Sequence, residues 1–375
     1  MIIGLPKETL PGETRIALLP QDMKQLASDI LSFHLETGAG LGACFSDESY
    51  IEAGAEVVPD VYPRSDVVIR INPPEIEDVA KLKEGSCLVS LINPFMNHDL
   101  IKKLADRNIS TFCLELIPRS TYAQSMDVLS SQATVAGYRA VLNAASHMGK
   151  FFPMLMTPAG TIKPAQVLII GAGVAGLQAI ATASRLGAKV EAFDVRPAAR
   201  EQVESLGAKF LYMDLDDSAE TESGYAVEMN EEFIRKEMEL LHDAAKRVDA
   251  IITTALIFGK KAPVLIKDYM VDDMQTGSCI IDLASENGGN CELTQPGDII
   301  NHNGVTIDGR LNLPSQVPYH ASQMLSKNIS KLLSELIGDG KIQFDMENEI
   351  VRGCLLTHEG KVTHETIKNS IEGDK

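Results

Sequence analysis

Residues 167–194 read VLIIGAGVAGLQAIATASRLGAKVEAFD, and this stretch decides the fold. The apolar run at its start predicts a buried strand, a Gly-x-Gly-x-x-Gly pattern follows at once, and the apolar spacing after it predicts a helix. The first glycine permits the tight turn, the second lets the backbone approach a pyrophosphate, and the third lets the helix pack closely on the strand. These glycines are Gly171, Gly173 and Gly176, and the N-terminus of the helix would face the phosphates with unpaired N–H groups.

Asp194 lies 18 residues beyond Gly176, at the end of a second predicted strand. An acidic side chain at this place hydrogen-bonds the ribose hydroxyls and repels a 2′-phosphate. A lone glycine pattern can be a turn without function, but here strand, turn, helix, second strand and terminal Asp all occur at the right spacing. The predicted ligand is therefore NAD(H) rather than NADP(H).

The composition limits the classes of function. A chain of 375 residues can form about two domains of ordinary size. Lys and Arg number 34 and Asp and Glu 52, so the net charge is −18, which opposes binding to nucleic acid or to an anionic lipid surface. We therefore expect no nucleic-acid partner. No apolar run approaches the ~18–20 residues of a membrane helix, so we also expect no direct membrane insertion.

The start of the chain and its cysteines favour a cytoplasmic protein. Residues 1–8 lack the basic segment and apolar core of a signal peptide, so we expect the mature chain to begin here. The six cysteines are scattered without a Cys-x-x-Cys pair, which is typical of reduced thiols. Neither they nor the eight histidines have the spacing of metal ligands, so we expect no disulfide framework and no metal.

Short apolar runs alternate with helical patterns along most of the chain, which predicts parallel α/β sheets. The first domain has strand-like runs at 2–5, 67–71, 87–92 and 110–116 and helical patterns at 21–32, 77–83 and 98–107. The strands expected after residue 165 lie at 167–170, 190–193, 209–212, 250–254, 278–283 and 305–307. A set of this kind completes a dinucleotide-binding domain. The expected fold class is α/β, with two Rossmann-like open parallel-sheet domains and a nucleotide cleft between them.

The connections define the domains. A helix over 127–149 is expected to join them, and a hairpin over 151–164 follows it. A long helix over 312–337 is expected to return to the first domain, to which strand-like segments at 342–346 and 350–356 are added. The expected domains are residues 1–133 with 320–375, and residues 134–319.

One acidic, polar connection interrupts the second domain at residues 214–232. A connection of this length without periodicity is usually a functional or a disordered loop.

The segment 118–130, PRSTYAQSMDVLS, is the richest candidate for chemistry. It follows a predicted strand at the carboxyl end of a parallel sheet, where the ligand sites of α/β proteins form. A solvated loop with an Arg–Asp pair and a serine N-cap explains the same residues. Spacing alone leaves both interpretations open.

This segment also carries a resemblance. Its pattern Pro-Arg-x-x-x-Ala-Gln-Ser-Met-Asp-x-Leu-Ser-Ser resembles the NAD(H)-binding alpha subunit (domain I) of proton-translocating NAD(P) transhydrogenase, in the alanine dehydrogenase/pyridine nucleotide transhydrogenase family. The resemblance runs from residue 1 to about residue 360. The other matching segments are residues 6–8, 12–15, 136–140, 171–176, 194–196, 253–256 and 288–291.

The resemblance implies which residues contact nucleotides. Arg119, Gln124 and Asp127 match the loop that holds the nicotinamide end of NAD(H), with Gln124 reaching toward a second nucleotide on a partner subunit, and they are the implied catalytic residues. Asp194 and Arg196 would flank the adenosine ribose. Val174 and Gly176 would lie under the pyrophosphate. The other implied nucleotide contacts are Gly171, Gly173, Ala175, Ser120, Thr121, Tyr122, Ser125, Met126, Ser130, Val195, Gly224, Tyr225, Glu237 and Leu256.

Within that list, Gly224 and Tyr225 match the tip of a mobile loop that closes over bound nucleotide. The family pattern there is usually Gly-Gly-Tyr-Ala, and this chain has Ser223 before Gly224. The flexibility of the loop is therefore expected to differ.

Two positions separate transhydrogenase from alanine dehydrogenase. Arg70-Ile71-Asn72 stands where alanine dehydrogenases resemble one another in having a substrate lysine, and Asn93 stands where their catalytic histidine falls. An amino acid dehydrogenase must take a proton from its substrate, and an asparagine is no base for that step near neutral pH. Direct hydride transfer between two nicotinamides needs positioning instead. Arg15 and Arg70 are expected to pair with carboxylates as structural remnants.

The resemblance finally implies partners. Hydride would pass between NAD(H) on this chain and NADP(H) on a partner subunit, coupled to proton translocation by membrane subunits. The chain would be cytoplasmic, peripheral at the inner membrane through these partners, and a homodimer in which the 151–164 hairpin exchanges between protomers. Because many relatives continue into membrane helices and this chain ends at Lys375, a split subunit is expected. An amino acid dehydrogenase and a non-catalytic NAD-binding module are the alternatives.

Overall fold

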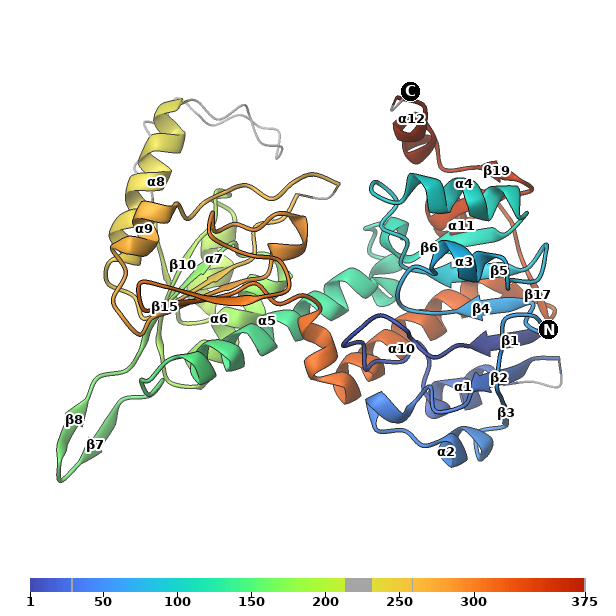
Figure 1. Cartoon of the computed structure of the whole chain (residues 1–375), viewed down its shortest axis with the longest axis horizontal. Helices are drawn as coiled ribbons and strands as arrows, with labels where there is room; N and C mark the ends of the chain where they lie inside the picture. The colour runs from blue at the N-terminus through green and yellow to red at the C-terminus, as the bar shows by residue number, and fades with distance from the viewer. Residues whose placement is uncertain (28–29, 213–230, 258, 374–375) are drawn as a thin grey trace. The chain divides into compact units, whose positions relative to one another are not determined.

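The computed structural model describes residues 1–27, 30–212, 231–257 and 259–373 (Figure 1). The chain forms two compact units: residues 1–132 with 314–375, and residues 133–313. Each unit has an α/β fold built on a mostly parallel sheet, which confirms the expected fold class.

The sheet of the first unit has the strand order β19-β18-β6-β5-β4-β1-β2-β3. The strands from β6 to β3 are parallel, and β18 and β19 continue the sheet in antiparallel pairing at the β6 edge. Its strands are β1 (Ile2–Leu5), β2 (Ser32–Glu36), β3 (Ala55–Val58), β4 (Val67–Ile69), β5 (Cys87–Ser90), β6 (Ser110–Cys113), β18 (Leu355–His358) and β19 (Lys361–Val362).

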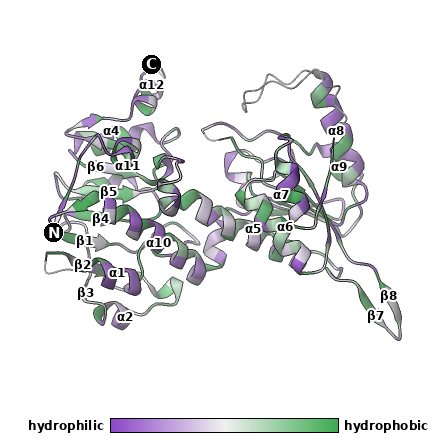
Figure 2. Cartoon of the chain, turned by 180° about the vertical axis from the view of Figure 1, so that it is seen from behind, coloured by the Kyte–Doolittle hydropathy of each residue, from purple (hydrophilic) through white to green (hydrophobic). Residues whose placement is uncertain are grey.

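Helices cover both faces of this sheet because successive side chains of a strand point to opposite sides. Val67 and Ile69 pack in the core that holds the apolar face of helix α10, whereas Val68 packs with helix α4. The α-helices are α1 (Pro20–Leu26), α2 (Asp47–Ile51), α3 (Ile76–Val79), α4 (His98–Asp106), α10 (Pro318–Leu336), α11 (Glu349–Cys354) and α12 (Glu365–Gly373). Short 3₁₀ turns are η1 (Leu41–Ala43), η2 (Leu114–Leu116) and η3 (Ala123–Met126). The central strands β4 and β5 are therefore buried along their whole length and mostly apolar, as Figure 2 shows.

The sheet of the second unit has the order β11-β10-β9-β12-β13-β15-β14, and β14 is its antiparallel edge strand. Val167 and Ile169 of β9 pack on the side of helix α6, and Leu168 and Ile170 pack on the side of α8 and α9. The strands are β9 (Gln166–Ile170), β10 (Lys189–Phe193), β11 (Lys209–Phe210), β12 (Ala250–Thr253), β13 (Cys279–Asp282), β14 (Ile299–His302) and β15 (Val305–Asp308). The helices are α6 (Val174–Arg185), α7 (Ala199–Ser205), α8 (Glu231–Ala245), α9 (Asp268–Asp272) and the 3₁₀ turn η5 (Ser285–Asn287).

Two connections run between the units along the chain. Helix α5 (Val128–His147) leaves the first unit, and the 3₁₀ turn η6 (Leu313–Gln316) leads back into it before α10. The expected helices over 127–149 and 312–337 are thus confirmed in kind, with the second beginning at Pro318. After α5, strands β7 (Leu155–Thr157) and β8 (Gly160–Ile162) form the expected antiparallel hairpin, which extends away from the rest of its unit (Figure 1).

The sequence-based expectation omits strands β2 and β3. His34 and Glu56 lie opposite each other in these neighbouring strands, and their side chains are 3.5 Å apart. A polar residue in the middle of each short run hides the apolar pattern of a buried strand. The helix expected over 21–32 is also too long, since α1 ends at Leu26 and Ser32 already belongs to β2.

Two further expectations need correction. Residues 350–356 form the helix α11 and the start of β18 rather than one strand, because the Asn348 side chain caps the helix by accepting from the N–H groups of Ile350 (2.8 Å) and Val351 (3.4 Å). Of the loop expected over 214–232, the last two residues begin α8, and the others lie outside the described residues.

The close packing of α6 on β9 predicts a large effect of one methyl group. A Cβ on Gly176 would lie 1.8 Å from the carbonyl oxygen of Gly171, whereas a Cβ on Gly173 would meet open space within 4 Å among the described residues. Gly176→Ala is therefore expected to lower the free energy of unfolding by about 1–3 kcal/mol or more, the usual cost of overpacking. Urea unfolding followed by circular dichroism measures this, with Gly173→Ala as the matched control. Equal stability of the two variants would contradict the packing described.

Candidate functional site

The glycine turn connects the end of β9 to the start of α6, and the residue that precedes the helix, Gly173, has no side chain. Gly171 has φ +96°, a conformation that favours glycine. The Thr254 hydroxyl, at the end of the neighbouring strand β12, donates to the carbonyl oxygens of Gly171 (3.0 Å) and Ile170 (3.2 Å). The N-cap residue of α6 is the exposed Gly173, where an added Cβ would meet none of the described residues within 4 Å. The first N–H groups of the helix have no partner within it. A helix N-terminus of this form fits the phosphates of a dinucleotide.

Asp194 follows β10 at the same edge of the sheet and is tied to the turn. Its Oδ2 accepts from the N–H of Ala172 at 2.7 Å. The Arg196 side chain forms a two-point ion pair with the same carboxylate, with both N···O distances at 2.9 Å. Burial raises the pKa of Asp194, but the hydrogen bonds from Arg196 and Ala172 outweigh it and hold the pKa below its usual value. The carboxylate is therefore ionised at neutral pH and aligned with the glycine turn.

A second buried carboxylate, Asp282, organises the neighbouring loop, and sequence reasoning missed it. Asp282 ends β13 and accepts from the N–H groups of Asn290 (2.8 Å) and Cys291 (3.0 Å). The Asn290 amide in turn brackets Ala255, accepting from its N–H at 3.0 Å and donating to its carbonyl at 2.9 Å. The loop that leads to Leu256 is thus fixed beside the glycine turn. Only the position of Asp282 at the end of an apolar run could have signalled this role.

The predicted loop of the first unit is anchored by two apolar side chains. Ala123 and Met126 are buried in the core, whereas Gln124 is exposed between them. The Ser120 hydroxyl accepts from the N–H of Ala123 (3.2 Å), and the Asn328 amide donates to a backbone carbonyl of the loop (2.8 Å). The 3₁₀ turn η3 therefore holds Gln124 outward on a fixed backbone. Met126 can face a ligand only through its backbone.

The next residues of this loop start α5. The Asp127 carboxylate accepts from the N–H (2.9 Å) and from the hydroxyl (2.6 Å) of Ser130. Asp127 thus caps α5, a role that the alternative interpretation gave to a serine. Arg119, Thr121, Tyr122 and Ser125 are exposed on the same segment.

The predicted residues thus fall into two groups, one in each compact unit. In the second unit the structure brings together the glycine turn, Asp194 and Arg196, and it places Val195 and Leu256 exposed on neighbouring loops. Glu237 is buried on α8, and burial raises its pKa. Gly224 and Tyr225 lie outside the described residues.

The positions that distinguish amino acid dehydrogenases lie in the first unit. Arg15 forms a two-point pair with Glu13 (2.9 and 2.6 Å), and Arg70 lies 3.8 Å from Glu8, so both pair with carboxylates as expected. Hydrogen bonds and charge from Arg15 outweigh burial and hold the pKa of Glu13 far below its usual value. Asn93 has φ +50° and an exposed side chain, and its N–H donates to the partly buried Glu115 at 2.7 Å. These groups can stabilise the first unit, but they supply no base at position 93.

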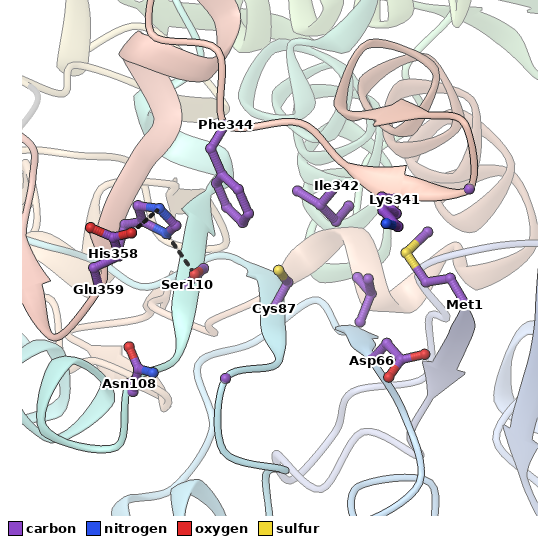
Figure 3. Close-up of a pocket in the computed structure, with 13 residues that line it drawn as sticks. Met1, Asp66, Cys87, Asn108, Ser110, Lys341, Ile342, Phe344, His358 and Glu359 are labelled. Atoms are coloured by element: carbon purple, nitrogen blue, oxygen red, sulfur yellow. Dashed lines mark hydrogen bonds and ion pairs between the residues drawn. The ribbon is translucent and has the colours of Figure 1, made fainter.

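A cavity of about 460 Å³ in the first unit is separate from these residues. Asp66, Cys87 and Ser110 line it and lie at the amino ends of β4, β5 and β6, as Figure 3 shows. The Ser110 hydroxyl is 2.9 Å from Nδ1 of His358, whose ring stacks on Phe344 with centroids 4.1 Å apart. The Arg119–Asp127 loop follows β6 at its carboxyl end, so the cavity lies at the opposite edge of this sheet. Ligand sites of parallel sheets form at the carboxyl ends of the strands.

Comparisons with known proteins cover both units. Residues 4–136 match the N-terminal domain of the alanine dehydrogenase/PNT family, and residues 140–365 match its C-terminal domain. In Rhodospirillum rubrum, the chain named as the first part of NAD(P) transhydrogenase subunit alpha is 45% identical over 97% of this chain and 98% of its own length. NAD(P) transhydrogenase subunit alpha of Haemophilus influenzae is 44% identical over 96% of this chain and 71% of its own length.

The fold agrees with these matches. The crystal structure of transhydrogenase from Sinorhizobium meliloti superposes with a TM-score of 0.86 at 39% identity, and the match covers 98% of this chain and 100% of the other. The chain therefore belongs to the alanine dehydrogenase/PNT family, and the relatives that it matches at 44–45% identity are alpha subunits of NAD(P) transhydrogenase.

Proposed function

We propose that this chain is the NAD(H)-binding subunit of a proton-translocating NAD(P) transhydrogenase. It passes hydride directly between its own NAD(H) and NADP(H) on a partner subunit, and membrane subunits couple the transfer to proton translocation. The observation that carries the proposal is the glycine turn, with its open helix N-terminus and with the ionised Asp194 bonded to Ala172 beside it.

The second unit holds the adenosine and pyrophosphate half of NAD(H). The N–H groups at the start of α6 bind the pyrophosphate, because they are unpaired donors at the positive end of a helix dipole. Gly173 leaves room for it, since a side chain there would project into the open space over the turn. Asp194 binds the ribose hydroxyls and Leu256 contacts the adenosine. Glu237 is a weaker candidate for a nucleotide contact, because its side chain is buried on α8.

The loop of the first unit supplies the reactive half. Hydride moves from C4 of one nicotinamide to C4 of the other, and no proton moves to or from an oxygen or nitrogen atom. The task of the protein is therefore alignment and exclusion of water. Arg119 and Asp127 hold the nicotinamide end, and Gln124, exposed on the rigid turn η3, reaches toward the second nucleotide. The hydrogen bond of Asp127 to Ser130 fixes the carboxylate for this role.

The alternative activity of an amino acid dehydrogenase is disfavoured by Asn93. That reaction takes a proton from the substrate, and the exposed amide of Asn93 offers no base. Arg15 and Arg70 are in addition engaged with the carboxylates of Glu13 and Glu8.

Partners bring the chain to the membrane. Among the helices that the structure describes, none combines the length and the apolar character needed to cross a bilayer. The proposed location is the cytoplasmic face of the inner membrane, through the NADP(H)-binding and membrane subunits. A homodimer forms in which the β7–β8 hairpin exchanges between protomers. Exposed Met154 and Met156, at 57% and 76% of full exposure, provide its apolar contact.

A mixing assay tests the proposed activity. The chain is incubated with NADH deuterated at C4 and with NADP⁺, in the presence or absence of an NADP(H)-binding transhydrogenase subunit, and mass spectrometry follows deuterium in NADPH. We expect transfer only with the partner, because this chain holds one of the two nucleotides.

Two results would support the alternatives. NADH binding without transfer in the presence of the partner identifies a non-catalytic NAD-binding module. In a separate incubation of this chain alone with alanine and NAD⁺, formation of NADH identifies an amino acid dehydrogenase.

Gln124→Asn tests the alignment role. The shorter side chain keeps the amide but withdraws it by one methylene, so hydride transfer is expected to slow at least tenfold, or about 1.4 kcal/mol in the activation barrier. The dissociation constant for NADH should change by less than about threefold, because the effect belongs to the reacting geometry. Single-turnover kinetics and NADH fluorescence titration measure the two effects. The matched control is Gln21→Asn, at an exposed glutamine on α1 of the same unit. Wild-type transfer rates in Gln124→Asn would remove this residue from the site.

A further inference from the structure

The Asp194 carboxylate uses all its acceptor positions within the chain. Oδ1 accepts from the N–H (2.8 Å) and from Nε (2.9 Å) of Arg196. Oδ2 accepts from the N–H of Ala172 (2.7 Å) and from a terminal guanidinium nitrogen of Arg196 (2.9 Å). A carboxylate has about four lone-pair positions, so the diol of a ribose must replace one of these donors.

Only the guanidinium can leave without changing the fold. The N–H groups of Ala172 and Arg196 are backbone donors in the two loops that close the sheet edge. The Asp194 side chain is 7% exposed, whereas the Arg196 side chain is 61% exposed and can rotate about its own torsions. Binding of a ribose to Asp194 therefore requires that Arg196 rotate away from it.

The same residue alters the charge that a 2′-phosphate meets. Asp194 alone presents one negative charge to the ribose, which rejects a phosphate on the 2′ oxygen. With the guanidinium of Arg196 beside it, the net charge at this position is close to zero. Because Arg196 is only two residues from Asp194, its guanidinium remains near the 2′ oxygen after it rotates away. An arginine at this place accommodates a 2′-phosphate.

We infer that Arg196 is a specificity-determining residue that competes with the NAD(H) ribose for Asp194 and weakens the rejection of NADP(H). This inference rests on the proposed function, because it takes Asp194 as the ribose acceptor. The residue thus opposes the cofactor preference that Asp194 alone would set. The competition is modest in size, because an ion pair with one exposed partner is easily replaced.

The test measures dissociation constants of NADH and NADPH for the full chain by fluorescence titration. Arg196→Gln is expected to bind NADH up to about fivefold more tightly, as expected for loss of an exposed ion pair, and to bind NADPH more weakly. Its preference for NADH over NADPH therefore rises. Arg196→Lys keeps the charge but loses the two-point pairing, so it should bind NADH more tightly while its preference stays nearer to that of the wild type. Neither variant should shift the thermal unfolding midpoint appreciably.

The outcomes separate this inference from the proposed function. Weaker NADH binding by Arg196→Gln would show that Arg196 contacts the nucleotide and would overturn the inference, as would equal changes for both nucleotides. The proposed role of Asp194 is tested by Asp194→Ala, which should weaken NADH binding and relax the rejection of NADPH. If the wild type binds no NADH, or if Asp194→Ala binds it as tightly as the wild type, the proposed ribose site itself fails.

Discussion

The contact between Gly176 and the carbonyl group of Gly171 is the constraint on which the nucleotide-binding unit depends. It brings the first turn of α6 against the end of β9 at a distance that leaves no room for a Cβ. Gly137 of α5 meets the same limit, since a Cβ there would lie 2.1 Å from the carbonyl oxygen of Ala175. The helix start is therefore fixed from two sides. The glycines thus bring the first turn of α6, whose N–H groups have no partner within the helix, close to the end of β9.

Carboxylates hold the loops around this edge. A loop that leaves a parallel sheet carries backbone N–H groups that need acceptors, and Asp194 and Asp282 provide them for the glycine turn and for the loop at Asn290. Asn290 extends the second network to Ala255, next to Thr254, whose hydroxyl returns to the carbonyl of Gly171. The result is a closed set of hydrogen bonds around a rigid turn. The guanidinium of Arg196, which pairs with Asp194, is exposed, so rotation of its side chain can remove it.

Sequence patterns predicted those parts of the structure that local rules determine. The strand, turn and helix at residues 167–185 follow from periodicity and from the three glycines, and the hairpin at 151–164 follows from its turn. Strands β2 and β3 were missed because His34 and Glu56 face each other within short runs, a pairing that only the folded sheet reveals. Asn348 directly before residues 349–354 is a sequence signal for the start of a helix, but the apolar run that follows it favoured a strand.

The candidate site divides in the same way. The glycine turn and Asp194 could be predicted from spacing, since each acts at a fixed position in a strand–helix unit. The roles proposed for Arg119, Gln124 and Asp127 rest on the resemblance, because polar residues on a loop have no periodicity. Asp282 and Asn290 could not be identified as organisers of the site, because their partners lie up to 35 residues away in the sequence. A buried polar network is a property of the tertiary structure.

The central proposal is that NAD(H) binds at the glycine turn of the second unit through its adenosine and pyrophosphate half. Amide hydrogen exchange of the full chain, with and without saturating NADH, tests it most directly. We expect slower exchange in residues 171–177, because the bound pyrophosphate accepts hydrogen bonds from these N–H groups and shields them from water. Slower exchange confined to residues 85–87, 341–344 and 358–359, which belong to the cavity at the amino ends of the first sheet, would contradict it.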